Sequence, residues 1–302
     1  MGFLLYKGDK YFKDPSFPLA VSYYQQSLTE PHSHDFHELV IVLNGSGQHV
    51  TESLTYPISV GDVFVVKPMC GHYYKDMSKL KLINILYLFD DLAIPRLDLI
   101  DIPGYHVLFE FEPALREKGC FKSRLNLDMG QLLTAERIVA KLHNELRRRG
   151  KGYRFVALLH FMELLAHLSR CYAPYGNSSS RRLLQVSSMM SFIERNFMNP
   201  ISLGEIIKKG HMSLSTANRA FREAISMTPI NYLIKVRMEH AAKLLRSGSG
   251  TVGEVAMRCG FKDSNYFSKQ FKQFMGKSPR GYQAFLSSPT TENGGNRSAS
   301  ST

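Results

Sequence analysis

The sequence predicts two domains: an all-β barrel with a helical hairpin in the N-terminal two-thirds, and an all-α domain in the C-terminal third. Short apolar runs broken by Gly, Pro and Asn fill residues 17–110 and indicate many short strands. Apolar residues at helical spacing fill residues 130–172. Residues 183–286 contain a weak internal repeat, which indicates one helical unit used twice. The 302 residues are enough for two separate cores.

The expected strands are short apolar runs bounded by turn residues, and they cover residues 37–43, 56–60, 63–66 and 80–88. Residues 44–47 (NGSG) are expected to form a hairpin turn, because Asn and Gly tolerate the backbone angles of tight turns. Two amphipathic segments on either side of residues 149–152 (RGKG) predict the helical hairpin. Two roles for this hairpin stay open: it packs against the barrel, or it forms a dimer interface.

Composition marks the domain boundaries. Residues 173–182 (APYGNSSSRR) are polar and rich in Pro, Gly and Ser, which predicts a linker. Residues 287–302 have low complexity and predict a disordered tail. The expected domains are therefore residues 1–172 and residues 183–286.

Positive charge is concentrated in the second domain. The chain has a net charge of +12, and residues 183–286 carry 15 Lys and Arg against 6 Asp and Glu. A basic domain attracts polyanions, of which nucleic acid is the commonest. The sequence shows no apolar run long enough to span a membrane and no signal-peptide pattern. The cysteines form no CxxC pair and indicate reduced thiols in a cytoplasmic protein: Cys70, Cys120, Cys171 and Cys259.

The internal repeat has an offset of 49–50 residues and pairs Leu203, Ile206, Ile207, Arg219, Phe221, Pro229 and Tyr232 with Val252, Val255, Ala256, Lys269, Phe271, Pro279 and Tyr282. In the second copy we expect a helix over residues 252–258, a glycine turn at residues 259–261 and a helix from Asp263 or Ser264 to Met275. Helix, tight turn and helix is the layout of a helix-turn-helix, whose second helix enters the major groove of DNA. The expected buried faces of these second helices are Ala217, Ala220, Phe221 and Ala224 in the first copy, and Phe267, Phe271 and Phe274 in the second.

Two longer patterns carry a family resemblance. They are the segment with Pro229, Tyr232, Leu233, Arg237, Met238, Ala241, Leu244 and Leu245, and residues 252–282 (VGEVAMRCGFKDSNYFSKQFKQFMGKSPRGY). Together with the repeat they resemble the DNA-binding domain of AraC/XylS-type transcription regulators over about 100 residues. Two positions depart from that pattern, Ser226 where glycine is usual and Ile207 where alanine is usual.

The resemblance implies that one chain lays two recognition helices in successive major grooves. Arg pairs well with guanine, Asn with adenine and Asp with cytosine, whereas Arg and Lys also contact phosphates. The predicted DNA-binding residues are Ser215, Asn218, Arg219, Arg222, Asp263, Asn265, Ser268, Lys269 and Lys272. Further phosphate contacts are expected from Lys208, Lys209, Lys262 and Lys277.

A second motif lies in the first domain. His32, His34, Glu38 and Gly45 have the spacing H-x-H-x3-E-x6-G, which resembles a cupin motif, and the segment from Gly61 to His72 resembles the other one. His32, His34, Glu38 and His72 are therefore a candidate metal set. Three interpretations stay open: a metal site, the lining of an effector pocket without metal, or structural histidines. The resemblance to the AraC type favours the pocket without metal or other cofactor.

The resemblance is strongest to the L-rhamnose-responsive members of that family. It is carried by residues 31–50, by Leu82, Asn84 and Tyr87, and by residues 259–265. The resemblance implies a small sugar as the effector, and His, Glu and Asn side chains are suited to bind hydroxyl groups. The predicted effector-binding residues are His32, His34, His37, Glu38, His72, Asn84 and Tyr87.

The sequence thus predicts a DNA-binding transcription regulator gated by a small sugar such as L-rhamnose, more in keeping with an activator than a repressor. The partners expected are double-stranded DNA, the sugar, RNA polymerase and a second copy of the chain. The alternative is a metal-dependent cupin enzyme with an appended basic domain. Because the sequence shows no P-loop, GxGxxG, GxSxG or HExxH pattern, we expect the chain not to be an enzyme.

Overall fold

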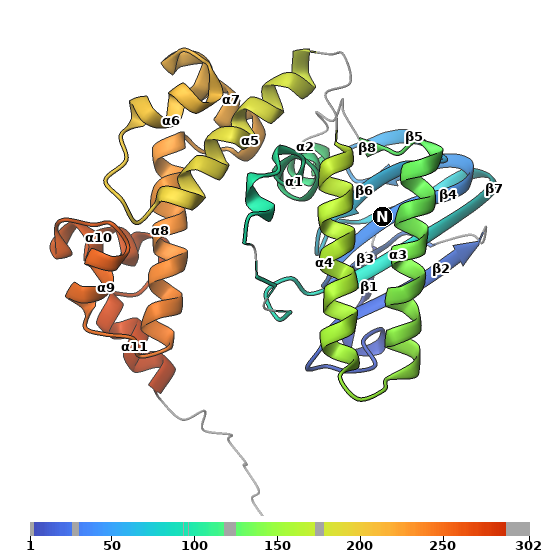
Figure 1. The fold of residues 1–302 in the computed structure, drawn as a ribbon, viewed down its shortest axis with the longest axis horizontal. Helices are drawn as coiled ribbons and strands as arrows, with labels where there is room; N and C mark the ends of the chain where they lie inside the picture. Colours follow the sequence, from blue (N-terminus) through green and yellow to red (C-terminus); the bar gives the residue numbers. More distant parts are fainter. Residues whose placement is uncertain are drawn as a thin grey trace, which may run out of the picture. The chain divides into compact units, whose positions relative to one another are not determined.

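The computed structural model describes residues 3–25, 30–92, 94–95, 97–117, 125–172 and 178–287 (Figure 1). The chain divides into two units: Met1–Phe192 with Gly204–Pro229, and Ile193–Leu203 with Ile230–Thr302. The first unit holds the sheet, the helical hairpin and the first predicted helix-turn-helix, and the second unit holds the second one. No helix in the described ranges is long and apolar enough to cross a membrane.

Among the described residues of the first unit, eight strands form one sheet in the order β1-β3-β7-β4-β6-β8, with β2 paired to β7 and β5 paired to β4. β1 and β3 run parallel, and the other pairs are antiparallel. The strands are β1 (Leu4–Tyr6), β2 (Leu19–Gln25), β3 (His32–His34), β4 (His37–Thr51), β5 (Thr55–Ser59), β6 (Asp62–Val66), β7 (His72–Tyr87) and β8 (Leu125–Asn126). The sheet-rich N-terminal domain is confirmed.

Side-chain alternation gives β4 two buried faces. Val40 and Val42 point into an interior cluster with Phe64 of β6. The opposite face carries His37, which pairs across the sheet with Tyr87. The Tyr87 ring lies 5.2 Å from the Phe161 ring of α4 (Tyr153–Cys171), and Figure 1 shows α4 and α3 (Met129–Arg148) lying across this side of the sheet. The helical hairpin therefore covers one face of the same strands whose other face forms the interior.

The prediction of a hairpin turn at residues 44–47 is wrong. β4 continues through them, with irregular register against β7 at Val42–Gln48, and the chain turns later, where the Thr51 backbone N–H donates to Leu54 O at 2.8 Å. Gly45 has φ +75°, and a Cβ there would lie 2.2 Å from the carbonyl oxygen of Ser78. The glycines thus form bulges that let two long strands approach closely, which local sequence cannot distinguish from a turn.

The helical hairpin consists of α3 (Met129–Arg148) and α4 (Tyr153–Cys171), and its position is as predicted. A capping box between Asp128 and Gln131 starts α3. The turn uses left-handed backbone at Arg149 (φ 52°) and Gly152 (φ 80°). Along the chain, β7 and β8 are separated by η2 (Leu99–Asp101), α1 (Pro103–His106), the π-helical η3 (Val107–Phe111) and α2 (Glu112–Glu117), and the 3-10 helix η1 (Gly8–Lys10) follows β1.

The remaining helices are α5 (Ser178–Asn196), α6 (Leu203–Gly210), α7 (Leu214–Ile225), α8 (Pro229–Arg246), α9 (Val252–Arg258), α10 (Ser264–Met275) and α11 (Pro279–Ser287). Residues 173–177 of the predicted linker and residues 288–302 of the predicted tail lie outside the described ranges. Residues 178–182 form the first turns of α5. The domain boundaries therefore stay a prediction.

Candidate DNA-binding surface and effector pocket

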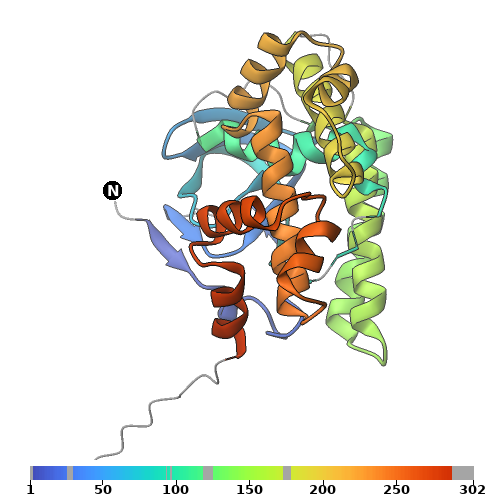
Figure 2. The same ribbon diagram turned by 90° about the vertical axis from the view of Figure 1, so that its left-hand side faces the viewer.

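The second helix-turn-helix consists of α9 and α10, and both helices begin at capping residues. Thr251 and Glu254 form a capping box at α9. Asp263 caps α10, because its side chain accepts a hydrogen bond from the Asn265 backbone N–H at 2.7 Å. Figure 2 shows these helices, in red, against the orange α8, and Phe267 and Phe271 are fully buried in the core that they share.

Phe274 is not part of that core, contrary to expectation. It is 40% exposed, and Met275 packs against the buried cluster instead. Spacings of three and four residues both keep a side chain on one helix face, so the pattern did not decide between residues 274 and 275.

Arg237 of α8 contacts two other segments of the second unit. Its Nε donates to Phe197 O at 2.8 Å and one terminal nitrogen donates to Asn199 O at 2.9 Å. The guanidinium lies 5.3 Å from the centre of the Phe261 ring, in the turn between α9 and α10. Burial lowers the pKa of Arg237 from its usual value. In the sequence this arginine is visible only as part of a motif, although a charged residue beside the buried Met238 is a signal of such a role.

Two glycines of the second unit allow a matched test of the turn. Gly260 and Gly276 have φ of 79° and 72°, but a Cβ would lie 2.7 Å from Phe197 O at Gly260 and meets nothing within 4 Å at Gly276. We expect Gly276→Ala to destabilise the protein by about 1 kcal/mol through its backbone angle alone. Gly260→Ala should cost about 2 kcal/mol because the clash is added.

Chemical denaturation of both variants measures this difference. Equal losses of unfolding free energy in the two variants would show that the close approach at Gly260 has no energetic consequence.

The first helix-turn-helix consists of α6 and α7. Ser213 caps α7 by accepting from the Thr216 backbone N–H at 3.3 Å. The predicted buried face is confirmed, with Ala217, Ala220, Phe221 and Ala224 all buried. Ser226, which departs from the family pattern, ends the helix in the left-handed conformation at φ 59°. The turn is therefore kept despite the missing glycine.

The predicted DNA-binding residues lie on the solvent side of α7 and α10. Seven are exposed, and Asn218 and Ser268 are half-buried. The Arg219 Nε lies 3.9 Å from Glu223 Oε1 one turn later, with the Arg219 side chain 65% exposed. Leu214 and Tyr266 were not among the predicted residues, and they are about half exposed in the first turns of α7 and α10. Large apolar side chains on a polar helix face were the signal for them, because such groups contact thymine methyls.

A cavity of about 220 Å³ opens inside the sheet of the first unit. Its walls combine aromatic rings with buried polar groups, and its lining residues are Tyr6, Tyr11, Ser22, Tyr24, His32, His34, Phe36, Glu38, His72, Tyr74, Asn84 and Leu86. The volume is below the usual range for drug-sized ligands and suits a smaller molecule. Asn84 Oδ1 is buried without a hydrogen-bond partner among the described residues, so it offers an acceptor to a ligand.

The structure brings together five of the seven predicted effector-binding residues in this cavity: His32, His34, Glu38, His72 and Asn84. His37 and Tyr87 lie on the other face of the strands, where their rings stack with centroids 5.2 Å apart. The reason is alternation, since His37 is adjacent to Glu38 and Tyr87 is adjacent to the pocket residue Leu86. Burial lowers the pKa of His37 to about 4.

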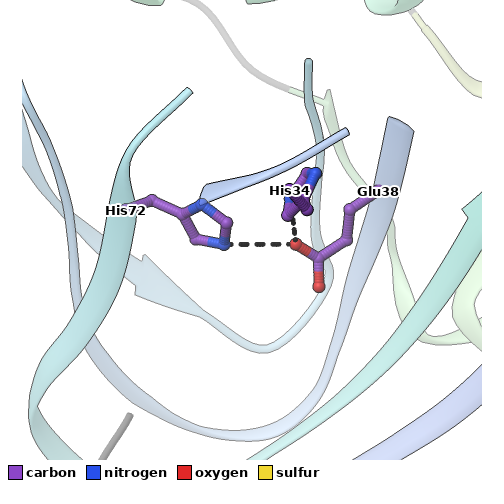
Figure 3. A group of neighbouring side chains, drawn as sticks. All are labelled: His34, Glu38 and His72. Carbon is purple, nitrogen blue, oxygen red and sulfur yellow. Dashed lines mark hydrogen bonds and ion pairs between the residues drawn. The ribbon is translucent and has the colours of Figure 1, made fainter. Parts of the chain in front are cut away.

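The polar end of the cavity is built on Glu38 (Figure 3). Its Oε2 lies 3.2 Å from His34 Nε2 and 3.2 Å from His72 Nε2, and all three side chains are at least nine-tenths buried. Burial, together with the nearby His72, lowers the pKa of His32.

A larger cavity of about 570 Å³ lies beside the loop at residues 67–71. His49 lines it, and the His49 ring is 5.3 Å from the ring of His72. Of the predicted effector-binding residues, none lines this second cavity. We therefore assign the candidate effector site to the smaller cavity.

Two family models match the chain: residues 206–284 match a "Helix-turn-helix domain", and residues 15–81 match an "AraC-like ligand binding domain". The transcriptional activator RhaR of Mannheimia succiniciproducens is 27% identical over 91% of this chain and 94% of its own length. The transcriptional activator RhaS of Citrobacter koseri is 31% identical over 84% of this chain and 87% of its own length.

Among solved structures, the C-terminal domain of AraT, a response regulator from Geobacillus stearothermophilus, is 30% identical over 33% of this chain and 84% of that chain, with a TM-score of 0.32. The similarity to the activators spans both units, the sheet with its cavity and the two helix-turn-helix motifs. The chain belongs to the AraC family of DNA-binding transcription regulators.

Proposed function

We propose that this regulator is an activator that binds DNA through α7 and α10 and responds to a small sugar, such as L-rhamnose, in the 220 Å³ cavity. The observation that carries the sugar proposal is the lining of that cavity. Buried His, Glu and Asn side chains bind hydroxyl groups, and the tyrosines offer flat faces to the apolar side of a sugar ring. The activator relatives support the direction of regulation.

Calorimetric titration of the full chain with a panel of deoxy-sugars and pentoses tests this function. We expect heat of binding with at least one sugar and a loss of at least tenfold in affinity for Asn84→Leu, which removes the unpaired acceptor. His160→Ala, a half-buried residue of α4 that does not line the cavity, is the control and should bind as the parent does. Absence of heat with every sugar would reject the sugar proposal while leaving DNA binding intact.

On the DNA side, Arg219, Asn218 and Asn265 are proposed to contact base edges, with Asp263 facing cytosine. Ser215, Ser268 and Lys269 are proposed to complete the base contacts, and Arg222 and Lys272 to contact phosphates. RNA polymerase is proposed as the protein partner of the activator. A regulator of this kind needs no catalytic group, and we propose none.

We further propose that the chain forms a homodimer through the helical hairpin. Exposed apolar side chains on both of its helices support this: Met129 and Leu133 on α3, and Phe155 and Leu159 on α4 are each 46–68% exposed. Phe155 and Leu159 are four residues apart on one helix, and adjacent exposed apolar side chains of this kind are typical of a protein interface.

The double variant Phe155→Glu/Leu159→Glu should therefore shift the protein from dimer to monomer, because it places two charges in the interface. Analytical ultracentrifugation measures the change, and Lys141→Glu, an exposed polar position of α3, should leave the dimer intact. A parent protein that sediments as a monomer at all concentrations would contradict the proposal.

A further inference from the structure

Three buried histidines of the effector cavity share one hydrogen-bonding arrangement. His32 Nδ1 lies 2.9 Å from Glu30 O, His34 Nδ1 lies 2.6 Å from Phe36 O, and His72 Nδ1 lies 3.2 Å from Cys70 O. A carbonyl oxygen only accepts hydrogen bonds, so each Nδ1 carries the proton and donates it. Each ring is therefore held in the tautomer whose Nε2 has a free lone pair.

These lone pairs do not point at donors. His34 Nε2 and His72 Nε2 both lie 3.2 Å from the same oxygen of Glu38, Oε2 (Figure 3). With neutral rings, three acceptor atoms face one another in a buried place, which is unfavourable unless something positive lies between them. Protons on both rings would place two imidazolium ions beside one carboxylate, with the His32 ring 4.4 Å from the His72 ring. A single divalent cation satisfies all three acceptors at once.

The distances fit such a cation. Nitrogen and oxygen ligands that lie about 2.1 Å from a transition-metal ion in tetrahedral or octahedral geometry are about 3.0–3.4 Å apart when they are adjacent. Both Nε2–Oε2 distances are 3.2 Å, and the three ligand atoms all lie within 4.8 Å of one another. Backbone carbonyls on the far nitrogen of each ring are the outer partners that orient metal-binding histidines.

We propose that His34, Glu38 and His72 bind a divalent transition-metal ion at the polar end of the cavity, with His32 beside them as a candidate fourth ligand. Two imidazoles and a carboxylate suit zinc, iron(II), cobalt(II) or manganese(II) and disfavour calcium or magnesium, which prefer oxygen ligands only. Three protein ligands leave coordination positions open, and because these residues line the cavity, a pair of sugar hydroxyls can fill them. This last step rests on the proposed sugar effector, whereas the metal site itself does not.

Metal binding is tested directly on the full chain, purified without a polyhistidine tag and stripped with a chelator. Titration with zinc(II) and cobalt(II) should give one ion per chain, and cobalt(II) should develop the visible absorption bands of nitrogen and oxygen coordination. His34→Ala, His72→Ala and Glu38→Gln should each weaken binding by at least tenfold. His37→Ala is the matched control, since it removes the neighbouring histidine that faces away from the cavity, and it should bind metal as the parent does.

Folding of the variants is followed by near-ultraviolet circular dichroism and thermal unfolding. Saturating metal should raise the unfolding midpoint of the parent and of His37→Ala, because it binds the folded state, and should raise that of folded His34→Ala by less. No metal binding by the parent, or binding that the ligand variants leave unchanged, would overturn the proposal.

The sugar titration, repeated on stripped and metal-loaded protein, separates this proposal from the proposed function. Metal binding without sugar heat would support the metal site and reject the sugar effector. Sugar heat in a protein that binds no metal would support the effector and overturn the metal site. Sugar affinity that rises at least tenfold on metal loading would support both.

Discussion

Replacing Asn265 by alanine should weaken binding to the specific DNA site by about 1–3 kcal/mol, which is about 5- to 150-fold, and leave binding to random DNA nearly unchanged. Asn265 is exposed in the first turn of α10, and its backbone N–H is already capped by Asp263, so the amide side chain is available for a base edge. Arg219→Ala on α7 should have an effect of the same size, with relaxed preference at a different base. Electrophoretic mobility shifts on both DNAs at fixed salt measure these changes.

Two further variants serve as controls for this experiment. Gln273→Ala changes an exposed residue in the last turn of the same helix and should leave both affinities as they are. Lys272→Ala should weaken binding to both DNAs alike and reduce the salt dependence, as expected for a phosphate contact. If Asn265→Ala and Arg219→Ala bound both DNAs as the parent does, the assignment of α7 and α10 as recognition helices would be wrong.

Arg237→Ala should destabilise the second unit by about 2–4 kcal/mol. The substitution removes two charge-assisted hydrogen bonds, leaves the carbonyl oxygens of Phe197 and Asn199 without these donors, and removes the cation from the Phe261 ring. The expected loss of unfolding free energy is smaller than for a fully buried arginine, because Arg237 is half-buried. Arg237→Lys should recover only part of the loss, since an ammonium group cannot reach both acceptors in the guanidinium geometry.

Chemical denaturation followed by circular dichroism measures the loss. The control is Arg258→Ala, because Arg258 is an exposed arginine that also donates to a main-chain oxygen, Ser249 O, at 2.8 Å. It should change the unfolding free energy by about 0.5 kcal/mol or less. Similar losses for both arginines would contradict the role given to Arg237.

The helical part of the fold was predictable because its signals are local. Thr251, Asp263 and Gly276 mark where α9 begins, where α10 begins and where α10 ends, and each acts within one turn of its own helix. The course of β4 was not predictable in the same way. Gly45 is read locally as a turn residue, and only the pairing of β4 with β7 makes it a bulge.

The residues of the candidate effector cavity were likewise only partly predictable from the sequence. The spacing of His32, His34 and Glu38 placed these residues together, because alternate strand residues share a face. The same rule places adjacent strand residues on opposite faces, and it therefore excludes His37 from the face of Glu38. The position of His37 outside the cavity was thus predictable from the sequence. The exposed polar side chains of α7 and α10 followed from helical periodicity, but the exposure of Leu214 and Tyr266 required coordinates.

β7 carries Asn84 in the cavity and, three residues later, Tyr87 against Phe161 of α4. A ligand that displaces this strand therefore also changes the packing of Tyr87 against the hairpin. By thermodynamic linkage, a change in that packing also alters the affinity for the ligand. Substitutions at Phe161 that favour one position of the strand should change sugar affinity, by at most the factor by which the sugar changes the balance between those positions. Residues that never touch the effector thus belong to the set that tunes its potency.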